Sequence, residues 1–240
     1  MSDATRTEHD SMGTVEVPAD ALWGAQTQRS LRNFDIADDR LPAELVHALA
    51  RIKQAAASVN ARLGVISESQ RDAIVTAASA VAEGQHDDQF PLRVWQTGSG
   101  TQTNMNVNEV ISNLAALAAG EPLGSQRPVH PNDHVNRSQS TNDAFPVAIH
   151  VATAEGIERR LLPELDRLIG VFAAKTELWK DLVKIGRTHL QDAVPLTLGQ
   201  EASAWRDQIS AARARIASSL SEIYPLPLGG TAVGTGLNAP

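Results

Sequence analysis

Apolar side chains recur at alternating steps of four and three residues between Pro42 and Gly64, and this spacing is that of one helix face. Gly64 stands where a glycine often ends a helix. A second helix is expected to begin at Ser67, because Gln70 three residues later completes a capping box, and to end at Gly84. The stripe of the first helix comprises Leu45, Leu49, Ile52, Ala56, Val59 and Leu63.

A longer stripe follows Pro195. Thr197 and Gln200 form a second capping box, and the helix that they open extends for about 26 residues, or roughly 39 Å. A stripe of that length has to be covered by partner helices, so we expect the core to be a helical bundle. Its apolar positions are Leu198, Ala202, Trp205, Ile209, Ala212, Ile216, Leu220 and Ile223.

The rest of the chain carries weaker patterns, and together they indicate a mainly α fold. Residues 143–179 are expected to form a long helical run that breaks near Pro163. The other expected elements are an extended piece at 15–18, a brief helix at 21–31, an extended piece at 92–95, a helix that follows the loop 97–101 and ends near 119, a polar connector at 120–136 and a short strand at 183–185.

Composition narrows the class of protein. Of the 240 residues, 42% are hydrophobic and only 4% aromatic, a balance that suits close contact between helices. The chain has no cysteine, which excludes disulfides, thiolate metal sites and cysteine-ligated iron–sulfur clusters. The first ten residues contain Asp3, Glu8 and Asp10 and no apolar run, and no segment approaches the roughly 20 apolar residues of a membrane span. We therefore expect a cytoplasmic protein without a secretory signal or a membrane partner.

Charge bears on the choice of partner. The formal net charge is −7, and no block of like charge forms a basic arm or an acidic tail, so nucleic acid is not an expected partner. A small anion would be repelled on average. Any site for one must therefore build a local pocket of positive charge or hydrogen-bond donors.

Three polar loops have the residue types for such a pocket. They are Ser99-Gly100-Thr101, Ser140-Thr141-Asn142 and Thr188-His189, each beside a predicted helix start or strand end. Free N–H groups at a helix N-terminus suit a carboxylate or a phosphate, and an imidazole carries protons near neutral pH. The alternative is that the first two loops are only caps and turns, and that His189 is a buried histidine bonded to backbone.

Asparagines and a fourth loop add to this pattern. Asn104, Asn106 and Asn108 cannot all face solvent from one helix, and a buried amide without partners costs about 1–3 kcal/mol, which is unexpected in a plain scaffold. The fourth loop mixes a cation, an imidazole, an amide and a carboxylate, and suits a small anion; the alternative is a surface loop with its own turn. Its residues are Arg127, His130, Pro131, Asn132 and Asp133. No metal site or cofactor is predicted, because residues 86–88 have no second ligand group nearby.

Several motifs, in order and at matching spacing, resemble the class II (iron-independent) fumarases of the fumarase/aspartase superfamily. They are residues 10–13 (DSMG), 17–29 (VPADALWGAQTQR), 84–88 (GQHDD), 96–109 (QTGSGTQTNMNVNE), 130–133 (HPND), 186–193 (GRTHLQDA) and 229–238 (GGTAVGTGLN). The resemblance covers about the first half of such an enzyme. It implies an N-terminal mixed domain over 1–138, followed by the first, incomplete part of a central helical bundle over 139–240.

The resemblance also implies a reaction, the reversible addition of water to fumarate to give L-malate, without a cofactor. His189 would act on the water or hydroxyl group, and Arg127 with residues 130–133 would form a second dicarboxylate site. Active sites in this family are shared between the subunits of a homotetramer. The catalytic serine loop lies outside the present sequence, so the chain alone is expected to be inactive. The substrate carboxylates would be held by Ser99, Gly100, Thr101, Ser140, Thr141 and Asn142, assisted by Thr188.

One departure affects substrate choice. The family usually reads Ser-Ser-Asn where this chain has Ser140-Thr141-Asn142, a form more typical of aspartases. His130 and residues 97–99 and 229–230 are in the fumarase form. The hydration of fumarate is therefore the main hypothesis. An aspartate ammonia-lyase and a non-catalytic helical scaffold of the same superfamily are the alternatives.

Overall fold

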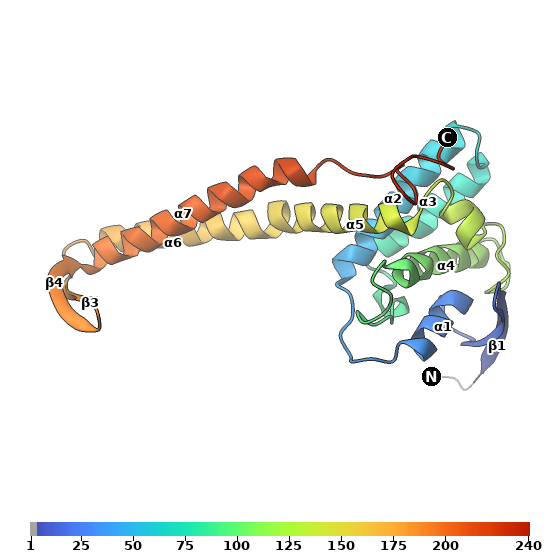
Figure 1. The fold of residues 1–240 in the computed structure, drawn as a ribbon, viewed down its shortest axis with the longest axis horizontal. Coiled ribbons are helices and arrows are strands. Elements are labelled where there is room, and N and C mark those ends of the chain that lie inside the picture. Colours follow the sequence, from blue (N-terminus) through green and yellow to red (C-terminus); the bar gives the residue numbers. More distant parts are fainter. Residues whose placement is uncertain (1–3) are drawn as a thin grey trace. The chain divides into compact units, whose positions relative to one another are not determined.

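The computed structural model describes residues 4–240, and it confirms the mainly α class. The helices α1–α7 are accompanied by two short antiparallel hairpins (Figure 1). The chain forms two compact units: the first contains the described residues up to Ala152 together with Leu226–Pro240, and the second is Thr153–Pro225. The domain boundary expected at 138/139 stays a prediction. Within residues 4–240, no helix has both the length and the apolar character that crossing a membrane requires.

The first unit begins with a hairpin of β1 (Thr5–Asp10) and β2 (Gly13–Pro18), followed by α1 (Ala25–Asn33). The sequence predicted only the second strand, because β1 is almost entirely polar and has no alternating apolar pattern. Val15 and Val17 from β2 pack with Ala21 and Ala25 in a small cluster of their own. Helix α1 starts four residues later than expected and ends two residues later.

The main core of the first unit lies between α2 (Ala43–Arg62), α3 (Glu68–Ala82) and α4 (Thr101–Ala118). The predicted capping box is confirmed: the Ser67 hydroxyl accepts from the Gln70 N–H at 3.2 Å. Gly64 and Gly84 follow the two helices with φ of +70° and +77°, which glycine adopts without strain. Apolar side chains that are fully buried in this core include Leu49, Ile74, Val107, Val110 and Ile111.

Two connecting segments of the first unit differ from expectation. The extended piece at 92–95 is wrong: only an isolated bridge joins Arg93 to Arg40, because no neighbouring strand offers an edge to a longer piece. The short helix η1 (Asp87–Gln89) precedes it. The connector at 120–136 ends in one wide helical turn, η2 (Pro131–Val135), which begins directly after His130.

The chain from Thr141 to the second hairpin is helical, as predicted for residues 143–179. Helix α5 (Thr141–Gly156) is followed by a wide turn, η3 (Ile157–Leu161), and by α6 (Leu162–Leu178). The predicted break near Pro163 is confirmed by η3. Pro163 lacks the N–H that would bond to the carbonyl four residues earlier, so regular α-helical bonding stops just before it.

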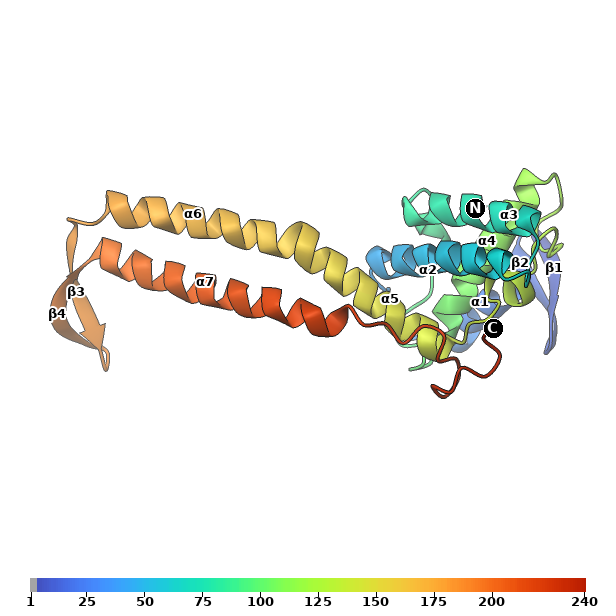
Figure 2. The same ribbon diagram turned by 90° about the horizontal axis from the view of Figure 1, so that it is seen from above.

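The second unit is built on α6 and α7 (Leu198–Ile223), which run side by side in both views (Figures 1 and 2). Helix α7 has the 26 residues and the Thr197–Gln200 capping box that were predicted. Arg213 pairs with Asp166 across the two helices at 2.8 Å. Phe172 and Trp205 meet edge to face, with ring centroids 5.9 Å apart.

The long apolar stripe of α7 is only partly covered. Among the described residues, just Gly199, Ala202 and Leu220 of α7 are buried, and no residue of α6 is. Leu178 at the end of α6 is 68% exposed. Two helices thus form a single packed seam and leave apolar side chains on their outer faces, so a full bundle would need further helices.

Candidate functional site

The loop before α4 has a shape that only glycine permits. Gly100 caps the helix with φ of +74°, in the left-handed region. A Cβ atom at this position would lie 2.5 Å from the ring of Phe145 on α5. The close contact brings the beginning of α4 against α5. Ser99 and Thr101 flank the glycine, with their hydroxyl oxygens 2.9 Å apart.

The loop before α5 combines capping with binding groups. The Ser140 hydroxyl accepts from the Asn142 N–H at 3.2 Å, so Ser140 caps the helix. This is the role that the alternative of a simple cap predicts. The Thr141 hydroxyl accepts from the Asn104 side-chain amide at 3.0 Å. The Asn142 amide donates to the carbonyl of Ala232 at 2.9 Å. The glycine-rich segment near Pro240 is thereby attached to the start of α5.

These two loops face one cavity of about 690 Å³ within the first unit, which we call the α4–α5 cavity. Thr101, Ser140 and Thr141 line it, whereas Ser99, which bonds to Thr101, does not. The other lining residues that matter below are Asn132, Asn136, Gln139, Thr231 and Asn238. Residues 40 positions apart in the sequence therefore meet around one space, at the N-termini of two helices, where free N–H groups favour an anion.

The predicted second anion loop lies at a neighbouring cavity of about 570 Å³, which shares Thr101, Met105 and Asn132 with the first. Its His130 ring accepts from the backbone N–H groups of Asn132 and Asp133, at 3.2 and 3.1 Å. His130 thus caps η2 through Nδ1. Glu8, Asp10 and Glu109 line the same cavity, and these carboxylates do not favour an anion there.

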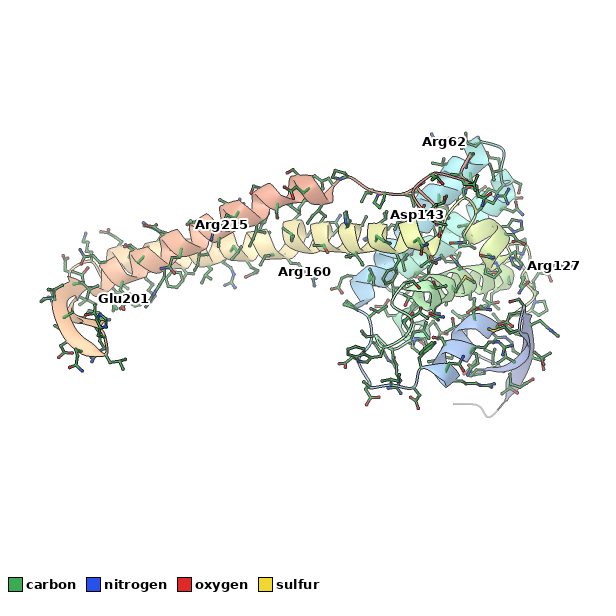
Figure 3. The ribbon with its side chains drawn as sticks, viewed as in Figure 1. Arg62, Arg127, Asp143, Arg160, Glu201 and Arg215 are labelled. Atoms are coloured by element: carbon green, nitrogen blue, oxygen red, sulfur yellow. The ribbon has the colours of Figure 1, made fainter. Side chains whose placement is uncertain are left out.

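Arg127 does not join these residues. Its side chain is exposed, lines neither cavity and lies at the periphery of the first unit (Figure 3). The carboxylates of the second cavity already have partners: Asp10 pairs with Arg29 at 2.8 Å, and this bond lowers the pKa of Asp10. A second anion site at Arg127 and residues 130–133 stays a prediction.

The asparagines of α4 are buried, and most of their groups are satisfied. Asn106 donates to the carbonyl of Gln89 at 3.1 Å, and Asn104 bonds to Thr141 and Asn136. In the described part of the chain, Asn108 Oδ1 is without a hydrogen-bond partner. The expected cost of buried amides is therefore mostly offset by contacts with residues distant along the chain.

Lys53 is the residue that the sequence pattern missed. Its side chain is 0% exposed and donates to side-chain oxygens of Asn104, Asn136 and Gln139, at 2.8, 2.9 and 2.9 Å. Burial lowers its pKa to about 7, and the negative charge of Asp143 opposes that shift. The sequence does indicate that Lys53 is buried, because it stands four residues after Leu49, inside the apolar stripe of α2. A lysine in such a position needs polar partners.

Residues 183–197 form a hairpin, whereas the sequence predicted only a strand at 183–185 and a loop at 188–189. Strands β3 (Val183–Thr188) and β4 (Gln191–Thr197) pair antiparallel, with Thr188 opposite Gln191. His189 and Leu190 form the two-residue turn, with φ of +51° and +63°. His189 is exposed, so the alternative of a buried histidine is wrong. Thr188 and His189 belong to the second unit, and the α4–α5 cavity belongs to the first.

The arrangement offers hydrogen-bond donors without a metal centre. Within residues 4–240, no three His, Cys, Asp or Glu side chains are grouped to hold a metal ion. The histidine–aspartate segment considered for metal uses Asp87 in a 2.7 Å pair with His47. Hydroxyl groups and helix N-termini in the α4–α5 cavity are suited to carboxylate oxygens, and an imidazole on an exposed turn is suited to proton transfer.

The two glycines of the first loop make a matched test of this geometry. Gly100→Ala is expected to lower the free energy of unfolding by about 1–3 kcal/mol, because it adds a strained φ and a contact with Phe145. Gly98→Ala should leave Tm unchanged, because its Cβ would meet no atom within 4 Å and its φ is not positive. Thermal melts of the two variants check this. Equal Tm values would contradict the tight contact with Phe145.

Comparison with known proteins gives consistent matches. The family model described as "Lyase" matches residues 13–240. The chain is 77% identical over its 240 residues to the class II fumarate hydratase of Prochlorococcus marinus (strain MIT 9313) and 63% identical to that of Parasynechococcus marenigrum (strain WH8102). All of this chain is aligned in both cases, with 52% of each relative. The chain thus spans about half the length of these relatives.

Solved structures agree with these matches. A class II fumarase from Schistosoma mansoni superposes with a TM-score of 0.94 at 49% identity, over 99% of this chain and 50% of that one. A fumarate lyase:delta crystallin from Brucella melitensis bound to cobalt gives 0.92 at 43% identity, over 99% and 52%. The fold of the described residues is therefore the fold of the corresponding half of these proteins.

Proposed function

The chain belongs to the lyase family whose model its residues 13–240 match, and from this membership we propose that the full-length protein hydrates fumarate reversibly to L-malate. The observation that carries the proposal is the meeting of Thr101, Ser140 and Thr141 around one cavity at the N-termini of α4 and α5. The relatives named fumarate hydratase class II support the same reaction.

The chemistry follows from the groups present. The hydroxyl groups of Thr101 and Thr141, at the positive N-terminal ends of α4 and α5, would hold the carboxylates of the substrate. Removal of a proton from the carbon next to a carboxylate places negative charge on that carboxylate. Each preorganised donor that stabilises this charge can raise the rate by about 10²–10³-fold. His189 would accept or donate the proton of the water or hydroxyl group, and Thr188 would assist in holding the substrate. No step needs a cofactor.

The proposal includes assembly into a homotetramer with shared active sites. Apolar side chains of α6 and α7 such as Leu168, Val171 and Trp205 remain 41–46% exposed in the described chain, and helices from other copies would bury them further. Thr188 and His189 stand on an exposed hairpin, where they are free to reach a site on another copy. A cytoplasmic location is part of the same proposal.

The test uses the full-length protein. Absorbance of fumarate should rise when L-malate is added and stay flat when L-aspartate is added. Release of ammonia from aspartate would instead assign the ammonia-lyase activity, for which Thr141 is the only feature in favour. A folded protein that acts on neither acid would favour the alternative of a non-catalytic scaffold. Chromatography with light scattering gives the oligomeric state of the same sample.

A further inference from the structure

The Lys53 side chain does not line the α4–α5 cavity, but it bonds to three amide side chains, two of which do. Asn104 belongs to α4, while Asn136 and Gln139 lie in the segment between η2 and α5 and line the cavity. The ammonium group has three N–H donors, and each meets one amide oxygen at 2.8–2.9 Å. Lys53 is therefore fully satisfied without any contact with the cavity itself.

The direction of these hydrogen bonds determines whether the cavity wall offers a hydrogen-bond donor to a ligand. When Lys53 is protonated, its ammonium group only donates, so Asn104 presents its oxygen to Lys53 and its NH₂ group to the other side. That NH₂ group donates to the Thr141 hydroxyl oxygen at 3.0 Å. Because Thr141 accepts this bond, its own hydroxyl hydrogen remains free to be donated to a second acceptor. Thr141 lines the α4–α5 cavity, where that acceptor would be the ligand.

We propose that Lys53 is a positioning residue, which orients the Asn104 amide so that Thr141 presents its hydroxyl hydrogen to a carboxylate oxygen of the substrate. The proposal rests on the proposed function for the identity of the ligand, a small dicarboxylate. Without Lys53, the Asn104 amide is free to turn over, and Thr141 would then donate to the Asn104 oxygen. The cavity would keep the same side chains but lose a donor.

Charge around Lys53 supports a fixed arrangement. Asp143 is the acidic group that acts on it, and it is buried at the start of α5 (Figure 3). One Asp143 oxygen accepts from the Ser140 N–H at 3.0 Å, and the other accepts from Gly229 and Thr231 at 3.1 and 2.8 Å. A buried cation and a buried anion thus both bond to the segment that precedes Thr141, at Gln139 and Ser140 respectively, and each has further hydrogen-bond partners.

The first test reverses the bond direction and keeps Lys53 paired. In the full-length protein, Asn104→Asp still accepts from Lys53, but it has no NH₂ group to donate to Thr141. The threonine hydroxyl would then donate to the new carboxylate. We expect the KM for fumarate and the Kd of succinate, a dicarboxylate that does not react, to rise about tenfold or more, which corresponds to one lost charge-assisted bond. Tm should stay near that of the parent.

The second test asks whether Lys53 acts through Thr141. Lys53→Met and Thr141→Val should each raise the KM and the Kd. The KM and Kd of the double variant should not exceed those of the single variant that binds more weakly. Additive losses would show that Lys53 supports the fold by another route. Leu49→Ala, on the same helix and equally buried, is the matched control: it should lower Tm and leave KM unchanged.

The outcomes separate this inference from the proposed function. Parent turnover with unchanged affinity in Asn104→Asp would overturn the role of Lys53 alone. A parent that binds succinate without hydrating fumarate would overturn the proposed function, and the Kd comparison would still decide the role of Lys53. A parent that neither binds nor reacts would overturn both. If Lys53→Met does not fold, the Asn104→Asp result decides the matter.

Discussion

Replacement of His189 by asparagine in the full-length protein is expected to lower kcat for fumarate hydration by about 10²–10⁴-fold, the usual contribution of a general acid or base. Asparagine has no group that titrates near neutral pH. It also tolerates the left-handed conformation, so it should keep the turn in which His189 has a φ of +51°. The variant therefore removes the proton carrier and preserves the hairpin.

The measurements are initial rates with fumarate and with L-malate, together with Tm and the molar mass in solution. His86→Asn is the control, because this imidazole lines neither cavity, and its kcat should stay within about twofold of the parent, far from the loss expected for a proton carrier. Loss of assembly in His189→Asn would assign the residue to a structural contact. Full activity in an assembled variant would remove His189 from the mechanism.

Glu109→Ala should lower the free energy of unfolding by about 4 kcal/mol or more, because the buried carboxylate is the acceptor for four donors at the start of α1. One oxygen accepts from the Gln26 N–H at 2.7 Å. The other accepts from the N–H groups of Gly24 and Thr27 and from the Thr27 hydroxyl, at 2.9, 3.1 and 2.6 Å. Without Glu109, these donors remain buried and unpaired.

Glu109→Gln gives a graded comparison, because it keeps the shape but replaces one acceptor oxygen by an NH₂ group. It should cost about 1–3 kcal/mol. Burial raises the pKa of Glu109 to about 7, so Tm is best compared at about pH 8, where the parent side chain is ionised. Glu68→Gln, at an exposed position, should change stability by less than about 0.5 kcal/mol. Equal effects of Glu68→Gln and Glu109→Gln would contradict this role of Glu109.

Local patterns were sufficient for the helices. The apolar stripe from Leu45 to Leu63 and the capping boxes at Ser67 and Thr197 each involve residues three or four positions apart, which a helix places on adjacent turns. The two hairpins were only half predicted, because a strand is defined by its partner. β1 is polar, and β4, for which no strand was predicted, contains Pro195.

The residue types of the site could be predicted from the sequence, but the contacts between its loops could not. The loops at 99–101 and 140–142 were identified from their residue types, and their meeting at one cavity depends on the contact between Gly100 and Phe145. Lys53 was missed because its three partners lie 51, 83 and 86 residues further along the chain. A pattern of neighbouring residues cannot predict partners at such distances along the chain.

The sequence by itself determined the mainly α class, the limits of the long helices and the residue types that suit a carboxylate, because these depend on interactions within one or two helical turns. Only the tertiary structure decided that His189 stands on a hairpin turn, that Arg127 lines neither cavity, and that a buried lysine bonds to the amide that donates to Thr141. The physical reason is that packing brings together residues that are distant along the chain. The direction of each hydrogen bond is then determined by the donors and acceptors that meet there.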